Sequence, residues 1–180
     1  MGAHMTARAH EMRDILDAVR RIVRTLHESS RASEKALGLT GAQLFVLQKL
    51  ADAPGLSLNT LATQTHTHQS SVSTVVSRLV ERGLVLRSAA PDDARRLELR
   101  VSAEGRRLVS RAPDAAQARL IDAIERLPPS RRRVLAGALV ELTSIMDLAG
   151  RAPVMFFDSP DRKGRRLSRG QRQSGSLASR

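Results

Sequence analysis

The fold is decided by one stretch, Gln69-Ser-Ser-Val-Ser-Thr-Val-Val-Ser-Arg-Leu-Val-Glu-Arg-Gly83. Residue propensity alone favours a strand, because the middle of the stretch is rich in β-branched side chains. The apolar residues, however, recur at the i, i+3, i+4, i+7 and i+8 spacing of one helical face, and they are Val72, Val75, Val76, Leu79 and Val80. Gly83 stands where the left-handed residue that ends many helices belongs. The spacing therefore predicts a helix that ends just before Gly83.

Three helices are predicted upstream of this stretch. A short apolar helix begins after a serine N-cap at about residue 57, and the polar residues 63–68 form the turn that leads to Gln69. Apolar residues at helical spacing predict a long amphipathic helix over about residues 7–29. A further helix is capped by Thr40 and ends before Pro54. It is apolar on nearly all sides, so we expect it to be buried.

A β-hairpin is predicted directly after Gly83. A short apolar run over residues 84–88 leads into the turn-rich residues 89–94. Residues 96–101 then alternate strictly, with Leu97, Leu99 and Val101 on one face and Arg96, Glu98 and Arg100 on the other. The tip is too long for a two-residue turn.

Two more helical segments complete the chain. Ser102 caps a helix that is bent or restarted at Pro113, and a last helix spans about residues 130–149. The fold class is therefore mainly α with a small β-hairpin wing. The order of short helix, turn, helix and hairpin over about residues 40–102 is that of a winged helix-turn-helix, flanked here by helices on both sides.

The predicted helix from Gln69 carries the candidate DNA contacts. The second helix of such a motif enters the major groove, and its polar face is turned toward the bases. That face holds Gln69, Ser70, Ser71, Ser73, Thr74, Ser77 and Arg78. Short hydroxyl side chains allow close approach, and the glutamine and arginine have the reach for bidentate contacts. The alternative is a merely solvated Ser/Thr face, which the following glycine and hairpin disfavour.

Arginines at the predicted hairpin form a second candidate DNA contact. Arg87, Arg95 and Arg96 suit a narrow minor groove or the flanking phosphates. The alternative is an exposed, charge-balanced turn, because Asp92 and Asp93 neutralise two of these charges. We expect Asp93 and Arg95 to pair and stiffen the tip.

The positive charge of the chain has two sources. The 180 residues include 30 Lys and Arg against 18 Asp and Glu, a formal net charge of +12. Residues 150–180 hold eight basic and two acidic residues, or +6, and residues 1–149 supply the other +6. This basic tail has the composition of disordered chain, except for Val154-Met-Phe-Phe157, an apolar group able to dock on the body. We assign the tail charge to non-specific phosphate attraction or to no function.

Composition excludes several classes of protein. With no cysteine, the chain has no disulfide, no cysteine zinc site and no thiol chemistry. No apolar run is long enough for a membrane span, so we expect a cytoplasmic protein without membrane contact. Residues 1–5 are typical of a remnant of an expression tag, with the native start at Met5. No phosphate loop, metalloprotease motif or nucleophile elbow is present, so we expect neither an enzyme nor a cofactor.

The sequence resembles the MarR family of bacterial regulators from Thr40 to about Leu148. The resemblance is carried by Leu39-Thr-Gly-Ala-Gln-Leu44, by residues 70–85, and by Asp93-Ala-Arg95 through Val101-Ser-Ala-Glu-Gly105. It implies a homodimer built by helices over about residues 6–30 and 103–149. It further implies a repressor on a pseudo-palindromic double-stranded DNA operator, released by a small molecule such as an aromatic acid or phenol. Family members often carry arginine at the position of Thr74.

Polar residues on the apolar faces of the first two helices indicate where such a molecule would bind. They are His27, Ser30 and Gln43, and Arg31 offers a charge partner for a carboxylate. The alternative is that these groups bond to backbone or to one another, as buried polar groups usually do.

Two other functions stay open at this point. His66 and His68 invite a metal-responsive regulator, although two histidines in the turn of a helix-turn-helix favour phosphate contact or capping over a metal site. The second alternative is an architectural protein that coats DNA without a ligand. A bounded footprint on DNA distinguishes a regulator from such a protein.

Overall fold

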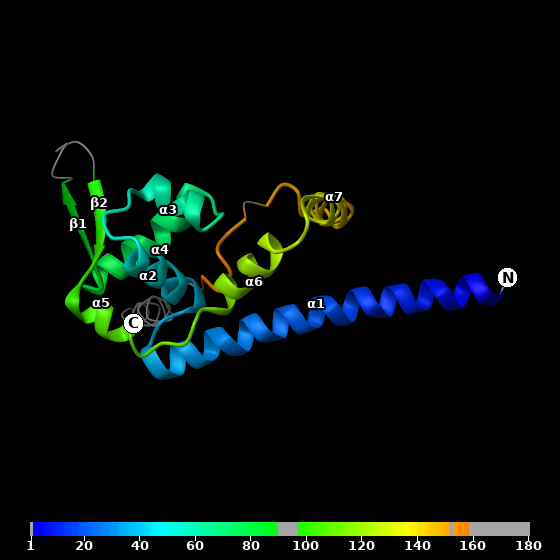
Figure 1. The fold of residues 1–180 in the computed structure, drawn as a ribbon, viewed down its shortest axis with the longest axis horizontal. Helices are drawn as coiled ribbons and strands as arrows, with labels where there is room; N and C mark the ends of the chain where they lie inside the picture. Colours follow the sequence, from blue (N-terminus) through cyan, green and yellow to red (C-terminus); the bar gives the residue numbers. More distant parts are fainter. Residues whose placement is uncertain (1, 90–96, 152, 159–180) are drawn as a thin grey trace, which may run out of the picture.

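A computed structural model describes residues 2–89, 97–151 and 153–158, with side chains from residue 7 onward. The elements, in chain order, are α1 (Gly2–Leu37), α2 (Gly41–Asp52), α3 (Leu58–Gln64), α4 (Gln69–Glu81), β1 (Val85–Ala89), β2 (Leu97–Val101), α5 (Ala103–Val109), α6 (Ala116–Glu125) and α7 (Pro129–Ile145). They form a lobe of α2 to α5 with the hairpin at one end of the long α1 (Figure 1). This architecture confirms the predicted class, mainly α with a two-stranded wing.

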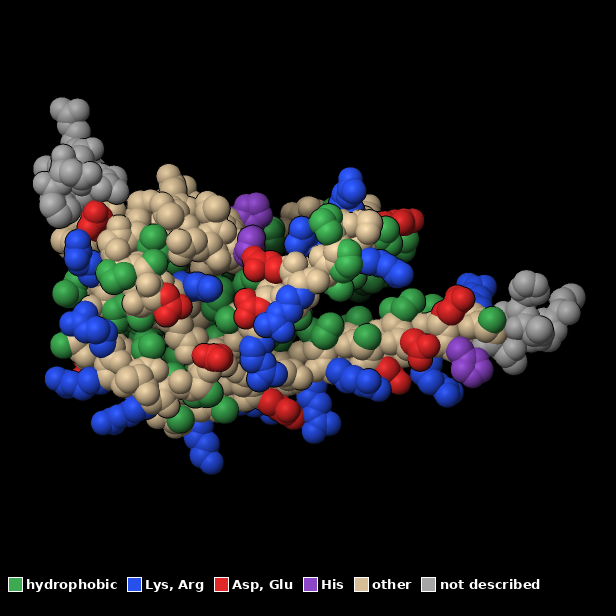
Figure 2. All heavy atoms as spheres, in the orientation of Figure 1, with side chains coloured by type: hydrophobic (Ala, Val, Ile, Leu, Met, Phe, Trp, Pro, Cys, Tyr) green, Lys and Arg blue, Asp and Glu red, His purple; other side chains and the backbone are tan. Residues whose placement is uncertain are grey.

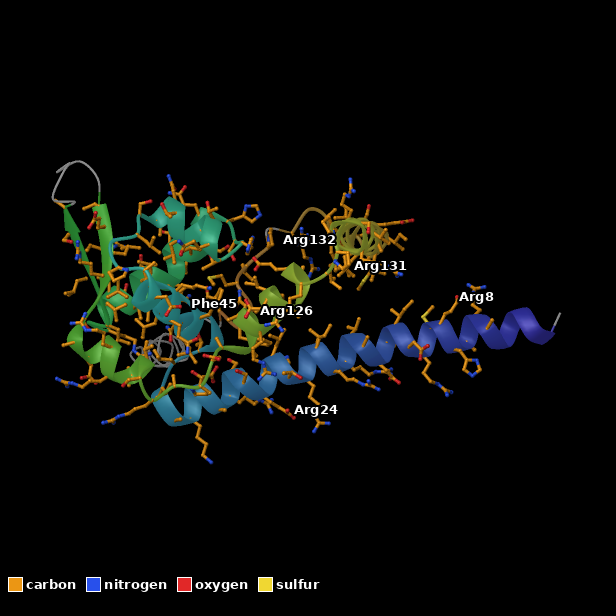
Figure 3. The ribbon with its side chains drawn as sticks, in the orientation of Figure 1. Arg8, Arg24, Phe45, Arg126, Arg131 and Arg132 are labelled. Carbon is orange, nitrogen blue, oxygen red and sulfur yellow. The ribbon has the colours of Figure 1, made fainter. Side chains whose placement is uncertain are left out.

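Helix α2 is the centre of the lobe. It packs against α1, α3, α4, α5, α6 and β2, and five consecutive or near-consecutive apolar residues are fully buried: Leu44, Phe45, Val46, Leu47 and Leu50. Phe45 points into the middle of the lobe (Figure 3). A capping box begins the helix, since Thr40 Oγ1 accepts from Gln43 N while Gln43 Oε1 accepts from Thr40 N. Each buried leucine contributes about 1.5–3 kcal/mol to the free energy of unfolding.

The helical interpretation of residues 69–83 is confirmed. In α4, Val72, Val75, Val76 and Leu79 are buried against the core, so burial of this stripe overrides the strand propensity of the β-branched residues. Gly83 ends the helix at φ +69°, a backbone conformation that glycine adopts without cost.

The wing is an antiparallel pair in which Val85 faces Val101 and Ala89 faces Leu97. The predicted alternation is wrong at two positions, because Glu98 is buried and Leu97 is exposed. The Glu98 carboxylate accepts a hydrogen bond of 2.9 Å from Arg100, which offsets the cost of burying the charge. The tip, with the expected Asp93–Arg95 pair, lies outside the described residues.

One helix ends later than the sequence predicts, and at Pro113 the structure decides between the two predicted alternatives. Helix α1 continues to Leu37 instead of ending near residue 29, because contacts with α2 hold its last turns. The segment around Pro113 is a restart and not a bend, since α5 ends at Val109 and α6 begins at Ala116.

Two helices carry apolar rows that the described chain does not cover. Helix α1 exposes Met12, Ile15, Leu16, Val19, Ile22 and Val23, and the row is visible in Figure 2. Helix α7 lies apart from the lobe and has no buried residue, although it carries Val134, Leu135, Leu139, Val140, Leu142, Ile145 and Met146. We call these rows the α1 stripe and the α7 stripe. None of the described helices is long and apolar enough to span a membrane.

Candidate nucleic-acid interface and adjoining cleft

The outward face of α4 is built from short polar side chains. Gln69, Ser70 and Thr74 are exposed, whereas Ser73 and Ser77 are half-buried. Thr74 Oγ1 donates a hydrogen bond of 3.1 Å to the carbonyl of Ser70, one turn earlier, so its hydroxyl proton is already used within the helix. With no long side chain at its centre, this face allows the helix backbone to approach base edges closely.

The wing is joined to this helix by a hydrogen bond. Arg87 on β1 donates to Ser77 Oγ over 3.0 Å. The contact places a guanidinium beside the outward face of α4, where a phosphate would also find it. Arg95 and Arg96, the other predicted wing contacts, lie outside the described residues.

Ser71 and Arg78 occupy a flank of α4 and contact the C-terminal segment. The two residues are seven positions apart and therefore lie on the same side of the helix. Ser71 Oγ donates a hydrogen bond of 3.0 Å to the carbonyl of Pro153, and Arg78 forms an ion pair with Asp158. We call residues 153–158 the strap. Two of the seven residues predicted to contact DNA from this helix thus contact the strap.

The strap runs from α7 back to the body (Figure 1), and one of its apolar residues, Met155, enters the core. Met155 is 2% exposed and belongs to the core cluster. The Phe157 ring lies 4.4 Å from the His27 ring on α1, measured between centroids. This docking confirms that the apolar group at residues 154–157 is able to contact the body.

Burial governs the ionisation of Asp158. Its side chain is 9% exposed, and desolvation raises the pKa of the carboxyl above its ordinary value, while the nearby charge of Arg78 lowers it to a smaller extent. The ion pair therefore does not drive docking by itself. The apolar contacts of Met155 and Phe157 supply the favourable free energy.

The cleft between α1, α2 and α6 contains part of the predicted ligand set. His27 faces the strap, and Ser30 lines a cavity of about 10 Å³ together with Leu26, Leu44, Phe156 and Phe157. A volume of about 10–15 Å³ holds one water at most. The strap therefore fills this cleft.

The other predicted ligand contacts have structural roles or lie elsewhere. Ser30 Oγ accepts from Gly41 N over 3.0 Å and bonds Glu34, which joins α1 to the start of α2. Gln43 completes the capping box and also accepts from Arg82 at 3.3 Å. Arg31 is exposed on α1. Ser30 and Gln43 therefore bond to other groups of the protein, which is the alternative to ligand contacts that the sequence left open.

Sequence reasoning missed Gln117, on α6. This residue is 7% exposed and lines the same cleft, yet its Oε1 has no hydrogen-bond partner among the described residues. A buried acceptor of this kind is costly unless a donor reaches it. Nothing in the spacing of the sequence distinguishes Gln117 from an exposed glutamine on an amphipathic helix.

A second cavity of about 260 Å³ lies between α1 and α6. Its walls combine two arginines, Arg21 and Arg119, with apolar Ile22, Leu26 and Leu120. Guanidinium groups beside an apolar floor suit a small ligand that carries both a carboxylate and a ring.

The two histidines of the turn, His66 and His68, have different positions and contacts. His66 adopts φ 50° and its Nε2 lies 3.3 Å from Glu125 Oε1 on α6. His68 is the N-cap residue of α4, but its side chain makes no capping hydrogen bond. Among the described residues, no group of three His, Cys, Asp or Glu is arranged to hold a metal ion.

A helix-turn-helix with a two-stranded wing and a polar outward helix defines a winged-helix DNA-binding protein. The family model for the MarR family matches residues 39–97. The chain is 32% identical over 133 residues to a putative transcriptional regulatory protein for the hcr operon of Thauera aromatica, a match that covers 74% of this chain and 76% of the relative. The protein belongs to the MarR family of transcriptional regulators.

Two further comparisons place the chain among similar proteins. It is 30% identical over 124 residues to the HTH-type transcriptional repressor Rv2887 of Mycobacterium tuberculosis, covering 69% of this chain and 89% of the relative. Among solved structures, it is similar to Bordetella bronchiseptica BpsR, whose DNA binding is regulated by 6-hydroxynicotinic acid. That likeness has 27% identity and a TM-score of 0.49, and it covers 75% of this chain and 91% of BpsR.

Proposed function

We propose that the protein is a homodimeric repressor that binds a pseudo-palindromic operator and leaves it when a small aromatic acid binds. One observation carries this proposal: a single chain presents one reading helix, α4, together with two uncovered apolar stripes on α1 and α7. One helix reads only a half-site, whereas a second copy joined through the stripes supplies the other half.

The stripes support a two-fold dimer. Soluble monomers rarely expose contiguous apolar rows of this length, and such rows mark interfaces with another protein. Closed two-fold association uses the same surface on both copies. Pairing α1 and α7 of one copy with those of the other would remove both stripes from water, and a pseudo-palindromic operator would require the two α4 helices of such a dimer to lie about one turn of DNA apart.

The name of one relative supports the repressor role. Rv2887, at 30% identity, is named a transcriptional repressor, and the chain covers 89% of its length. Occupation of an operator by a dimer excludes other proteins from that DNA, which is the simplest way for a winged-helix dimer to lower transcription.

For the effector, we assign the cavity between α1 and α6. Arg21 and Arg119 would hold the carboxylate of an aromatic acid, and Leu26 and Leu120 would pack against its ring. This assignment replaces Arg31 as the charge partner, because Arg31 is exposed outside that cavity. A tenfold loss of operator affinity requires about 1.4 kcal/mol of preference for the conformer that does not fit DNA.

The experiment combines sedimentation with footprinting. The purified chain would be used to select a duplex from a random library, and that duplex would be footprinted with and without benzoate and hydroxybenzoates. We expect a dimer, a bounded protected site, and loss of protection with at least one acid. Uniform coverage without sequence preference would instead support an architectural protein. Loss of protection with a chelator would support the metal-responsive alternative.

A further inference from the structure

We propose that the strap is a tethered competitor of DNA: docked in the cleft, it holds Ser71 and Arg78 of α4, and full DNA binding requires it to leave. This inference rests on the proposed DNA-binding function of α4. It adds a regulatory contact that belongs to this chain's own C-terminal segment.

The strap is held in place by apolar side chains. Met155 is buried in the core cluster, and Phe157 lies against His27 while Phe156 lies 6.4 Å from Phe157. Phe157 adopts φ 59°, a left-handed conformation that aromatic residues rarely take. Strain of this kind persists only where the surrounding contacts outweigh it. The strap is therefore packed specifically against the body of the protein.

The polar contacts of the strap involve the groups that DNA would use. Arg78 Nη1 donates to the Asp158 carboxylate, so a phosphate that approaches this nitrogen has to share it with the carboxylate or displace it. Asp158 also brings a carboxylate to the flank of α4, close to the path of the phosphates. The Ser71 hydroxyl donates to the carbonyl of Pro153 and has no second proton for DNA.

The strap also lies between the lobe and the long helix α1. It contacts α4 through Ser71 and Arg78 and α1 through His27. Docking thus spans the two parts whose relative position sets the spacing of the reading helices. A competitor docked for nine-tenths of the time lowers apparent DNA affinity about tenfold.

Full-length point variants test this proposal. Phe157→Ala removes the ring from His27 and should tighten binding, by about fivefold to tenfold, to a duplex selected by the unaltered chain. Val154→Ala is the matched control, because Val154 is in the same strap but 72% exposed. Equal affinities of the Phe157→Ala variant and the unaltered chain would overturn the proposal. If neither the unaltered chain nor the variant selects any duplex, the proposed DNA-binding function fails as well. That result differs from equal affinities for a selected duplex, which would overturn only the role of the strap.

A reversible cross-link provides the opposite perturbation. Because the chain has no cysteine, Ser71→Cys combined with Pro153→Cys creates a single thiol pair, on two residues that the 3.0 Å hydrogen bond from Ser71 Oγ to the Pro153 carbonyl brings together. Oxidation should lower DNA affinity at least fivefold, and reductant should restore it in the same sample. Unchanged affinity after complete oxidation would overturn the proposal.

Discussion

Arg78 on the reading helix is paired with Asp158, a residue 80 positions further along the chain. The pair joins the helix most directly concerned with DNA to the segment that follows the last helix. A change in the C-terminal segment therefore also changes the surroundings of Arg78 on the DNA-facing helix.

Arg119 is expected to bind the carboxylate of the effector. Arg119→Gln should weaken binding of the most effective benzoate about tenfold, because one charge-assisted hydrogen bond contributes about 1.5–3 kcal/mol. Arg31→Gln is the matched control, since Arg31 is exposed and outside the cavity. Isothermal titration of both variants checks this, and an equal loss in the two would contradict the assigned cavity.

Arg87 is expected to contact a phosphate when DNA is bound. Arg87→Ala should weaken operator binding and lower the slope of log affinity against log salt by about 1. Arg24→Ala is the control, because Arg24 lies on α1 and points away from the lobe (Figure 3). Fluorescence anisotropy over a salt series is the measurement. An unaltered slope in the Arg87 variant would place the wing away from the DNA backbone.

The α1 stripe is expected to form the dimer interface. Val19→Glu places a carboxylate in this stripe, where Val19 is 44% exposed, and should yield monomers. Arg20→Glu puts the same group on the next residue, whose side chain is 69% exposed and paired with Asp17, and should leave dimers. Sedimentation velocity distinguishes the two results. Dimers of undiminished stability in the Val19 variant would require a different interface.

Gly105 is expected to be irreplaceable for steric reasons. A Cβ atom there would lie 2.5 Å from the Leu84 carbonyl and 2.7 Å from Val101 Cγ1, which are backbone and packed core. Gly105→Ala should therefore cost about 1–3 kcal/mol of unfolding free energy. Gly137→Ala meets nothing within 4 Å on α7 and should gain about 0.5–1 kcal/mol. Urea denaturation measures both, and equal effects would show that the close approach at Gly105 relaxes freely.

The periodic parts of the fold were predictable, and the long-range contacts were not. The spacing of Val72, Val76 and Leu79 identified α4 against its strand propensity, because one packed stripe outweighs local preference. The end of α1 was missed because Ser30 and Ser33 resemble a polar terminus. In the structure Ser30 is 3% exposed and accepts from Gly41 N, so a tertiary contact sustains the helix.

The candidate site shows the same division. The outward residues of α4 follow from helical geometry, and the structure places Gln69, Ser70 and Thr74 on the exposed side. The diversion of Arg78 to Asp158 has no periodic signal, since it depends on how the chain returns after α7. Gln43 was assigned to a ligand from its place on an apolar helix, whereas a capping box uses the same residue type three positions after threonine.

The unbroken course of α1 gives the molecule a long lever arm. Its 36 residues span about 54 Å at 1.5 Å per residue. The C-terminal end of the helix is fixed to the lobe through the hydrogen bond between Ser30 and Gly41, and the N-terminal end is the tip. Tilting such a rod by about 5° displaces its tip by about 5 Å, more than the rise of about 3.4 Å along the DNA axis from one phosphate of a strand to the next. A ligand wedged beside Arg21 and Leu26 would need to move α1 only slightly to put the two reading helices out of step with the double helix.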